Sequence, residues 1–175
     1  VMTDERMEQE DAKAAIVATG RAVAGEFLQL AAILLLIGIG IGFVLPLHYT
    51  PLAPHLNGLG WRMYLLRPLH TGATIGWIYL AGMAMVYRWL FEHLCLHRTD
   101  SDSLALARRV ARRARLQRWL WMLSALIAAT AYATGHTWTG LLIQDLPVTL
   151  ALVALYWAVL AAPLRALAHA SIGRR

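Results

Sequence analysis

A histidine stands near the start of the second long apolar stretch of this chain, in the sequence Leu66-Arg67-Pro68-Leu69-His70-Thr71. Titratable side chains are rare inside membrane-spanning segments and need a reason to be there. Imidazole is a standard axial ligand of haem iron. Arg67, one helical turn away, is suited to pairing with haem propionates because guanidinium groups bind carboxylates in a bidentate manner. Haem is therefore the first chemistry predicted at His70; the alternative is a histidine hydrogen-bonded to a carbonyl group.

Two further residues complete the candidate haem site. His136 lies at a comparable depth on the next apolar stretch, and four-helix bundles can place two histidines on facing helices. It is the candidate second axial ligand, with a ligand from another subunit as the alternative. Spacings of three and four from His70 give mostly small residues, which leave room for a flat group: Ala73, Thr74, Trp77, Ala81 and Ala84. We therefore predict that His70, His136, Arg67 and Trp77 bind the cofactor, with the two histidines as metal ligands.

Pro68 suits the first turn of a helix, where its missing N–H costs nothing. The sequence therefore predicts a helix from about Arg67, with His70 in its first turn and about 5 Å along the axis from Arg67. Gly72 and Gly76 form a small-xxx-small pair suited to close helix contact. Three glycines of the preceding stretch are interpreted first as packing residues and second as a cofactor groove: Gly38, Gly40 and Gly42.

The four apolar stretches lie at about residues 23–47, 67–91, 119–137 and 147–162. About 20 apolar residues suffice for a helix to cross a bilayer. The 175 residues are 59% hydrophobic and 15% charged, which is outside the usual range of soluble domains. We predict an all-α, polytopic membrane protein: a four-helix transmembrane domain over 23–167, an exposed or amphipathic N-terminal segment over 1–22, and a basic tail over 168–175.

The net charge of +6 is concentrated between Arg88 and Arg118. A basic protein can bind nucleic acid, but the positive-inside rule explains arginines between two spans more simply, so no nucleic-acid partner is predicted. An even number of spans puts both termini on one side of the membrane. The arginine-rich connection between the second and third spans lies on that same side, which is predicted to be the cytoplasm. Residues Arg108–Arg118 are predicted to form a cytoplasmic-surface helix held by anionic lipids. His70 and His136 then lie near the outer face, and the first span is predicted to be a retained anchor.

Other chemistries find no support in the sequence. The single Cys95 excludes an internal disulfide and any all-cysteine metal site. The chain has no Gly-rich phosphate loop, no Ser-His-Asp constellation and no carboxylate pair, and no acidic residue at mid-bilayer for a proton relay. We therefore predict no catalytic residues. The remaining histidine pairs, His48 with His55 and His93 with His97, are expected to be solvated.

The stretch Arg62 to Ala73 resembles the start of the second helix in the catalytic subunit of C-family haem–copper oxidases and bacterial nitric oxide reductases. There the motif is close to Arg-Leu-Arg-Pro-Leu-His-Thr, followed by small residues. Three later stretches look like that family's third-to-fourth helix turn and fourth helix: Gly135-His136-Thr137, Leu146-Pro147 and Tyr156-Trp157. The resemblance implies that His70 is an axial ligand of a low-spin haem b and that Arg67 is a propionate neighbour.

The resemblance covers only the first third of such a catalytic subunit. The family's second low-spin haem ligand and its active-site ligands come from later helices, so oxygen or nitric oxide reduction is not implied, and His136 receives no family role. The first hypothesis is a b-type haem subunit of a respiratory electron-transfer complex in the bacterial inner (cytoplasmic) membrane. Its partners would be other membrane subunits, and it would not be a catalyst alone.

The alternative is a haem-free structural subunit, derived from an oxidase fold, that packs against partner transmembrane helices. A channel or transporter is a weaker hypothesis, because the spans lack interior charge and paired broken helices.

Overall fold

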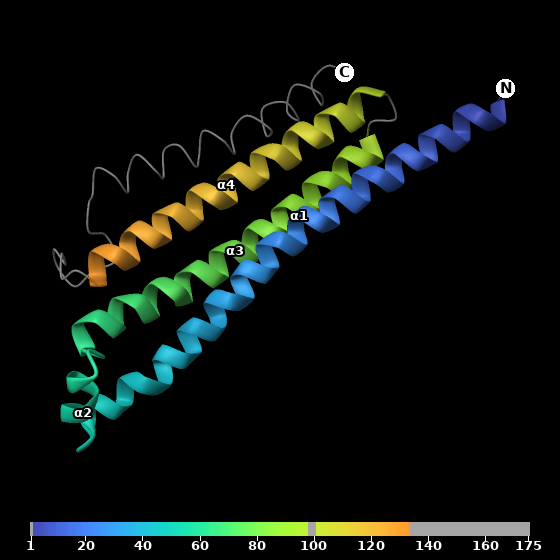
Figure 1. The fold of residues 1–175 in the computed structure, drawn as a ribbon. Coiled ribbons are helices and arrows are strands. Elements are labelled where there is room, and N and C mark those ends of the chain that lie inside the picture. Colours follow the sequence, from blue (N-terminus) through green and yellow to red (C-terminus); the bar gives the residue numbers. More distant parts are fainter. Residues whose placement is uncertain (1, 98–100, 134–175) are drawn as a thin grey trace.

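The computed structural model describes residues 2–97 and 101–133, and within these ranges every regular element is a helix. The elements are α1 (Met2–Val44), the 3-10 helix η1 (Leu45–Tyr49), α2 (Ala53–Gly58), α3 (Met63–His97) and α4 (Ser101–Ala133). The all-α class is thus confirmed. Helices α1 and α3 run antiparallel and side by side, α4 lies along them, and α2 lies at the end where α1 meets α3 (Figure 1).

Helix α1 passes through the predicted boundary between the N-terminal segment and the first span. Residues 2–22 and the apolar stretch that follows form one helix of 43 residues. The N-terminal part is rich in alanine and charged residues that favour helix, including a Glu10–Lys13 ion pair of 3.2 Å. Pro46 falls at the beginning of η1, where a proline costs no hydrogen bond.

Helix α3 begins at Met63, before the predicted start at Arg67. The backbone N–H groups of Leu65 and Leu66 both donate to the carbonyl of Arg62, which initiates the helix before the proline. Pro68 therefore lies inside α3 and not in its first turn, and His70 is the eighth residue of the helix. The structure corrects the prediction on this point: the helix continues through Pro68 with one i→i−4 hydrogen bond missing.

Helix α4 joins two elements that were predicted separately. The arginine-rich surface helix and the beginning of the third span form one helix of 33 residues. It runs along α1 and α3 instead of lying across the end of the bundle (Figure 1). Residues 134–137 of the third span, the fourth span, the basic tail and His136 lie outside the described residues.

The hydrophobic core is concentrated where all three long helices meet, and we call this region the three-helix end: residues 16–31 of α1, 80–91 of α3 and 103–117 of α4. Its buried positions alternate in steps of three and four, as in a coiled-coil seam. One such seam in α3 consists of Leu80, Ala84, Tyr87 and Phe91, with Met83 and Leu90 buried beside it; in α4 the seam is Ser103, Ala107, Val110, Ala114 and Gln117, with Leu106 and Ala111 buried beside it. The largest buried side chains of α1 here are Ile16 and Phe27.

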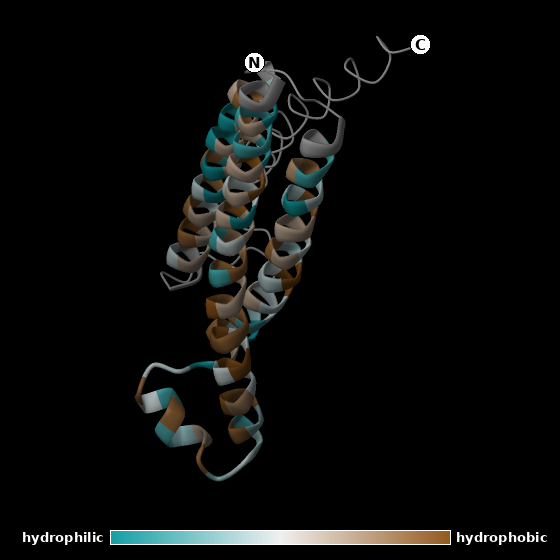
Figure 2. Cartoon of the chain, turned by 90° about the vertical axis from the view of Figure 1, so that its right-hand side faces the viewer, coloured by the Kyte–Doolittle hydropathy of each residue, from teal (hydrophilic) through white to brown (hydrophobic). Residues whose placement is uncertain are grey.

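The most apolar residues lie elsewhere, in the region that we call the loop end: residues 32–49, 53–58 and 63–79. Arg6–Tyr49 and Met63–His93 are long and apolar enough to cross a membrane, and these are the two such helices in the described part of the chain. In the most apolar 18-residue segment of each helix, only 11% and 28% of the residues are buried. The core helix of a soluble protein would be mostly buried. Figure 2 shows this apolar half of the α1–α3 pair in brown, leading to the α2 loop.

Candidate functional site

His70 faces α1, and its imidazole is held there by a hydrogen bond. Nδ1 lies 2.7 Å from the carbonyl oxygen of Gly38, so Nδ1 carries the proton and donates it. The ring rests on Gly42, where an added Cβ would be 2.9 Å from Cε1 of the imidazole. Gly42 therefore provides the space that the histidine occupies. The imidazole therefore connects α3 to α1 by a polar contact.

The rest of the His70 face is also filled by α1. A Cβ added at Gly38 would lie 3.4 Å from the Thr74 hydroxyl oxygen and 3.6 Å from Cβ of Ala73. The Thr74 hydroxyl donates to the carbonyl of His70 over 2.8 Å. Trp77 and Ala81, further along this face, pack against the hydrophobic core. At Ala73 and Thr74, α1 occupies the room predicted for a flat group, because Gly38 lets its backbone approach closely.

The other predicted cofactor-binding residues are Trp77, described above, together with Arg67 and His136. The side chain of Arg67 is exposed, while its backbone carbonyl accepts a hydrogen bond from the Thr71 hydroxyl at 3.0 Å. His136 lies outside the described residues. Within residues 2–97 and 101–133, no three His, Cys, Asp or Glu side chains converge in a way that could hold a metal ion.

The loop between α1 and α3 is held by a second histidine. His48 Nε2 lies 2.6 Å from the carbonyl oxygen of Trp61, which ties η1 to the start of α3. Gly60 takes φ +81°, a conformation that glycine adopts without strain, and this lets the chain turn before Trp61. His55 is exposed. Near the opposite end of α3, the His93 ring stacks on Trp89 at 5.1 Å.

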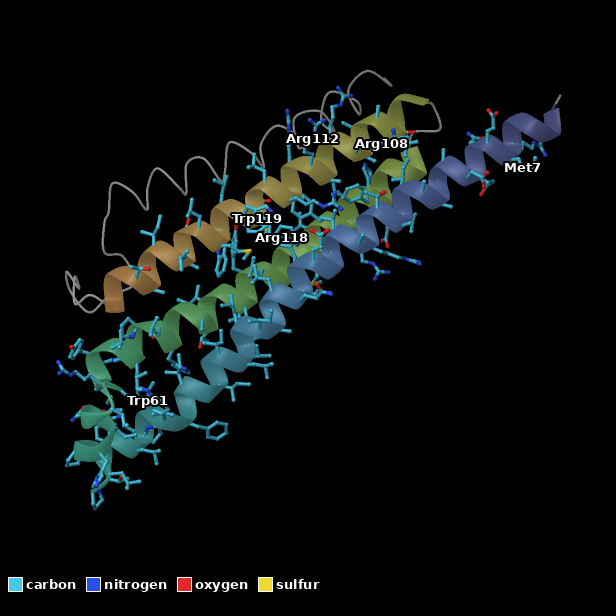
Figure 3. All side chains as sticks on the ribbon, viewed as in Figure 1. Met7, Trp61, Arg108, Arg112, Arg118 and Trp119 are labelled. Atoms are coloured by element: carbon cyan, nitrogen blue, oxygen red, sulfur yellow. The ribbon has the colours of Figure 1, made fainter. Side chains whose placement is uncertain are left out.

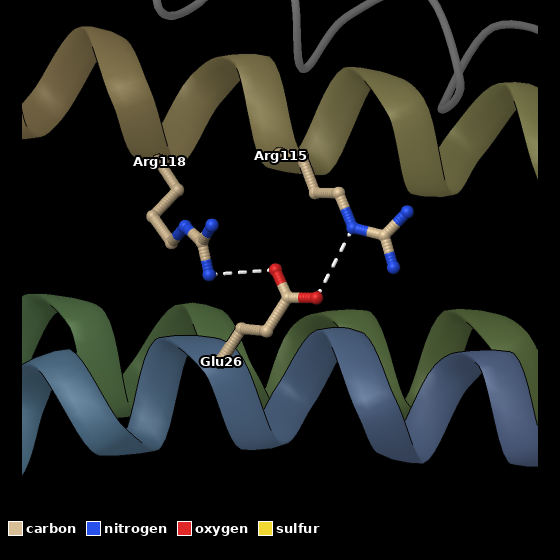
Figure 4. Close-up of polar contacts among 3 residues, drawn as sticks. All are labelled: Glu26, Arg115 and Arg118. Atoms are coloured by element: carbon tan, nitrogen blue, oxygen red, sulfur yellow. Dashed lines mark hydrogen bonds and ion pairs between the residues drawn. The ribbon is translucent and has the colours of Figure 1, made fainter.

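The charged cluster of the bundle was not predicted from the sequence. Glu26 of α1 receives two arginines of α4: Arg115 Nε lies 3.1 Å from Oε1, and Arg118 Nη1 lies 2.6 Å from Oε2 (Figure 4). The Glu26 and Arg118 side chains are only 26% and 19% exposed. The Arg118 guanidinium also lies 5.9 Å from the ring centroid of Trp119. We call these three charged residues the Glu26 clamp, because they join α1 to α4.

A buried neutral hydrogen bond lies in the same layer. The Tyr87 hydroxyl of α3 donates to Oε1 of Gln117 in α4, and neither residue is exposed. The Tyr87 ring packs against Phe27 of α1 at a centroid distance of 5.3 Å. All three long helices therefore contribute to one layer of polar and aromatic contacts. In the sequence, the signal that could have pointed to this layer was Glu26, since an acidic residue within an apolar stretch requires a partner.

Comparison with known proteins gives one partial match. A family model described as a domain of unknown function (DUF4184) matches residues 126–175. No curated protein and no solved structure matches the chain. The matched residues include the end of α4, and from residue 134 onward they lie outside the described part of the chain. The resemblance to haem–copper oxidases therefore rests only on the residues quoted for it.

Proposed function

We propose that this chain is a multi-pass protein of the bacterial cytoplasmic membrane that acts as a haem-free structural subunit and packs against partner transmembrane helices. One observation carries the proposal: the face of α3 that would hold a cofactor is covered by α1. The His70 imidazole donates to the Gly38 carbonyl, and Ala73 and Thr74 lie against Gly38. The histidine then serves helix packing.

No described helix covers the outward faces of α1 and α3, whose exposed side chains can meet lipid or partners. On α3, one outward seam repeats in steps of three and four: Ile75, Ile78, Gly82, Met85 and Trp89. Gly82 has open space where a Cβ would be. A small residue within such a seam allows a second helix to approach closely. The outward face of α1 carries larger side chains and suits lipid: Leu28, Ile33, Leu36, Ile37, Ile39 and Phe43.

Charge distribution supports the topology with the α2 loop outside and the α3–α4 connection in the cytoplasm. Residues 45–61 contain no lysine or arginine, whereas exposed arginines crowd the first half of α4. Positive charges favour the cytoplasmic side of a membrane.

Labelling of single cysteines tests the insertion and this topology. In a Cys95→Ser background, Asn57→Cys places a thiol on α2 and Met7→Cys places one near the N-terminus; both native side chains are exposed. A membrane-impermeant maleimide should label the first variant in intact spheroplasts and the second only after lysis. Labelling of both variants in intact spheroplasts, or recovery of the protein in the soluble fraction, would refute the proposal.

Substitutions on α3 test the packing role. Gly82→Leu should reduce the size of the complex extracted from native membranes by mild detergent, because the added side chain blocks close helix approach. The matched control is Gly40→Leu on α1, where the space beside the glycine is also open. A complex whose size is unchanged by Gly82→Leu would show that partner helices do not use this seam.

A second candidate is the b-type haem subunit of a respiratory electron-transfer complex, and one observation favours it. Metal-bound histidines commonly donate their other ring N–H to a backbone carbonyl, as Nδ1 of His70 does to Gly38. In this candidate, Nε2 of His70 and His136 would hold the haem, which supplies one-electron transfer. Arg67 and Trp77 would flank it, and other membrane subunits would exchange electrons with it.

A reduced-minus-oxidised spectrum of the purified complex separates the two candidates. The structural subunit shows no b-type absorbance from this chain. The haem subunit shows a b-type spectrum that His70→Ala abolishes and that His55→Ala, on the exposed loop, leaves unchanged.

A further inference from the structure

We infer that four exposed arginines of α4 form a binding surface for the headgroups of anionic lipids in the cytoplasmic leaflet. We call them the arginine ladder: Arg108, Arg109, Arg112 and Arg113. The inference rests on the proposed membrane insertion and adds the lipid class and the residues that select it.

The ladder contains charges that the described protein does not neutralise. Arg108 and Arg112, like Arg109 and Arg113, are four residues apart, a spacing at which like charges repel on a helix. No ion pair joins any of the four to the described residues, in contrast to Arg115 and Arg118, which pair with Glu26. The arginines of α4 thus form two sets. One set is used inside the bundle, and the other has no ion pair with the described residues and can therefore bind an external anion.

The position of the ladder selects lipid as the source of that anion. Immediately after it, α4 exposes an apolar stripe suited to hydrocarbon: Leu116, Trp119, Leu123 and Leu126. Trp119 marks the border, since tryptophan prefers the headgroup level of a membrane. Arg112 lies seven residues before Trp119, or about 10 Å along the helix, and long arginine side chains extend toward headgroups from such positions. Figure 3 shows Arg108 and Arg112 on the first half of α4, followed by Arg118 and Trp119.

Among the described residues, the opposite face of α4 offers no acidic side chain that could pair with the arginine ladder. It is packed into the three-helix end through small and apolar side chains: Leu106, Ala107, Val110, Ala111 and Ala114. Each basic residue near an anionic surface is worth about 1 kcal/mol, or about fivefold in affinity. Four arginines that act together therefore give a large preference for phosphatidylglycerol over phosphatidylcholine.

The test compares lipid binding to the full chain in detergent, with bound lipids counted by native mass spectrometry. Phosphatidylglycerol should bind at least about tenfold more tightly than phosphatidylcholine, given the value of each cation at a membrane surface. The variant with Arg108→Gln, Arg109→Gln, Arg112→Gln and Arg113→Gln should lose this preference and keep its melting temperature. The preference of the unmodified protein should also fall as salt is raised from about 0.05 M to about 0.5 M, because salt screens exposed charges.

Arg115→Gln is the matched control, because this arginine lies in the same helix but pairs with Glu26. It should lower the melting temperature and keep the lipid preference. A preference that survives in the four-glutamine variant overturns the inference, because other residues then select the lipid. An unmodified protein that binds the two lipids equally well also overturns it and points to an acidic soluble partner instead. A preference lost equally in Arg115→Gln also overturns it. Failure of membrane insertion would be seen separately, in the labelling of Asn57→Cys.

Discussion

The three-helix end and the loop end hold their helices together in different ways. At the three-helix end, Phe27, Tyr87 and Phe91 are fully buried, and charged and polar side chains lie beside them. At the loop end the residues are more apolar but mostly face outward, and α1 contacts α3 through Gly38, Gly42 and His70. Apolar composition and burial are therefore separated along this bundle.

The difference follows from the solvent proposed for each region. Lipid is as apolar as leucine, so burial of a leucine gives no driving force between helices in a bilayer. Close backbone approach and hydrogen bonds remain, and the loop end uses both. At the membrane border and beyond it, water restores the hydrophobic effect, and large side chains can form a core. Four substitutions test this contrast, with melting temperatures and unfolding free energies measured in detergent.

The largest effect is expected for Phe91→Ala. Phe91 is fully buried, and it packs so closely on Gly20 that a Cβ there would lie 2.5 Å from Cβ of the phenylalanine. The loss of a buried phenylalanine costs about 3–5 kcal/mol of unfolding free energy. Phe43→Ala at the loop end, where the side chain is 75% exposed, should cost less than about 0.5 kcal/mol. Equal losses from both variants would break the comparison.

Glu26→Gln should have the next largest effect, because it leaves two arginines without their carboxylate. Removal of one partner from a buried ion pair costs several kcal/mol; with Arg115 half-exposed and Arg118 partly buried, we expect about 2 kcal/mol. Glu92→Gln is the control, since its pair with Arg88 is exposed and should contribute about 0.5 kcal/mol or less. Adding Arg118→Met to Glu26→Gln should recover part of the loss, and no recovery would contradict the clamp.

Tyr87→Phe should cost about 1–2 kcal/mol, because the buried Gln117 amide loses the hydroxyl that donates to it. Replacing both partners, with Tyr87→Phe and Gln117→Leu, should be less harmful than the single change, since no polar group is then left buried. Tyr64→Phe, at an exposed position of the loop end, is the control. A double variant less stable than the single variant would show that Gln117 stabilises the core by more than its hydrogen bond with Tyr87.

The smallest effect is expected at the loop end, from Gly42→Ala. The added methyl group would push the His70 ring away from the Gly38 carbonyl. Interhelical hydrogen bonds in membranes average about 0.6 kcal/mol, so we expect a loss of roughly that size. In a His70→Ala background the same change should instead stabilise the helix slightly, because alanine favours helix over glycine. Gly40→Ala, facing open space, should also stabilise, and a loss there would sharpen the search for a partner of α1.

The parts of the fold that could be predicted are those with a local signal. The apolar runs predicted two spans that coincide with long helices. Close packing was predicted at Gly38, Gly40 and Gly42, and it is observed at Gly38 and Gly42, whereas Gly40 faces open space. The boundary at residue 22 was drawn from a change of composition, but helix propensity continues through it. Pro68 is predicted in a first turn because its missing N–H costs nothing there, whereas the helix begins earlier, with two N–H groups that donate to the carbonyl of Arg62.

The contacts that define the candidate site could not be predicted in the same way. Arg115 lies 89 residues from Glu26, and Gln117 lies 30 residues from Tyr87. Nothing in a local pattern pairs residues at such separations. The haem prediction at His70 rests on the spacing along its own helix and on His136 as a second ligand, and neither signal reveals that the Gly38 carbonyl accepts from the imidazole. It stays a prediction, and the measured spectrum decides it.

The amino-acid sequence by itself determined the helices and the length of their apolar stretches, because these depend on neighbouring residues. The tertiary structure alone decided what His70 and Glu26 touch. A lone imidazole or carboxylate in an apolar stretch requires a partner. The antiparallel packing of α1 on α3 selects the Gly38 carbonyl for His70, and the position of α4 alongside α1 selects the two guanidinium groups for Glu26.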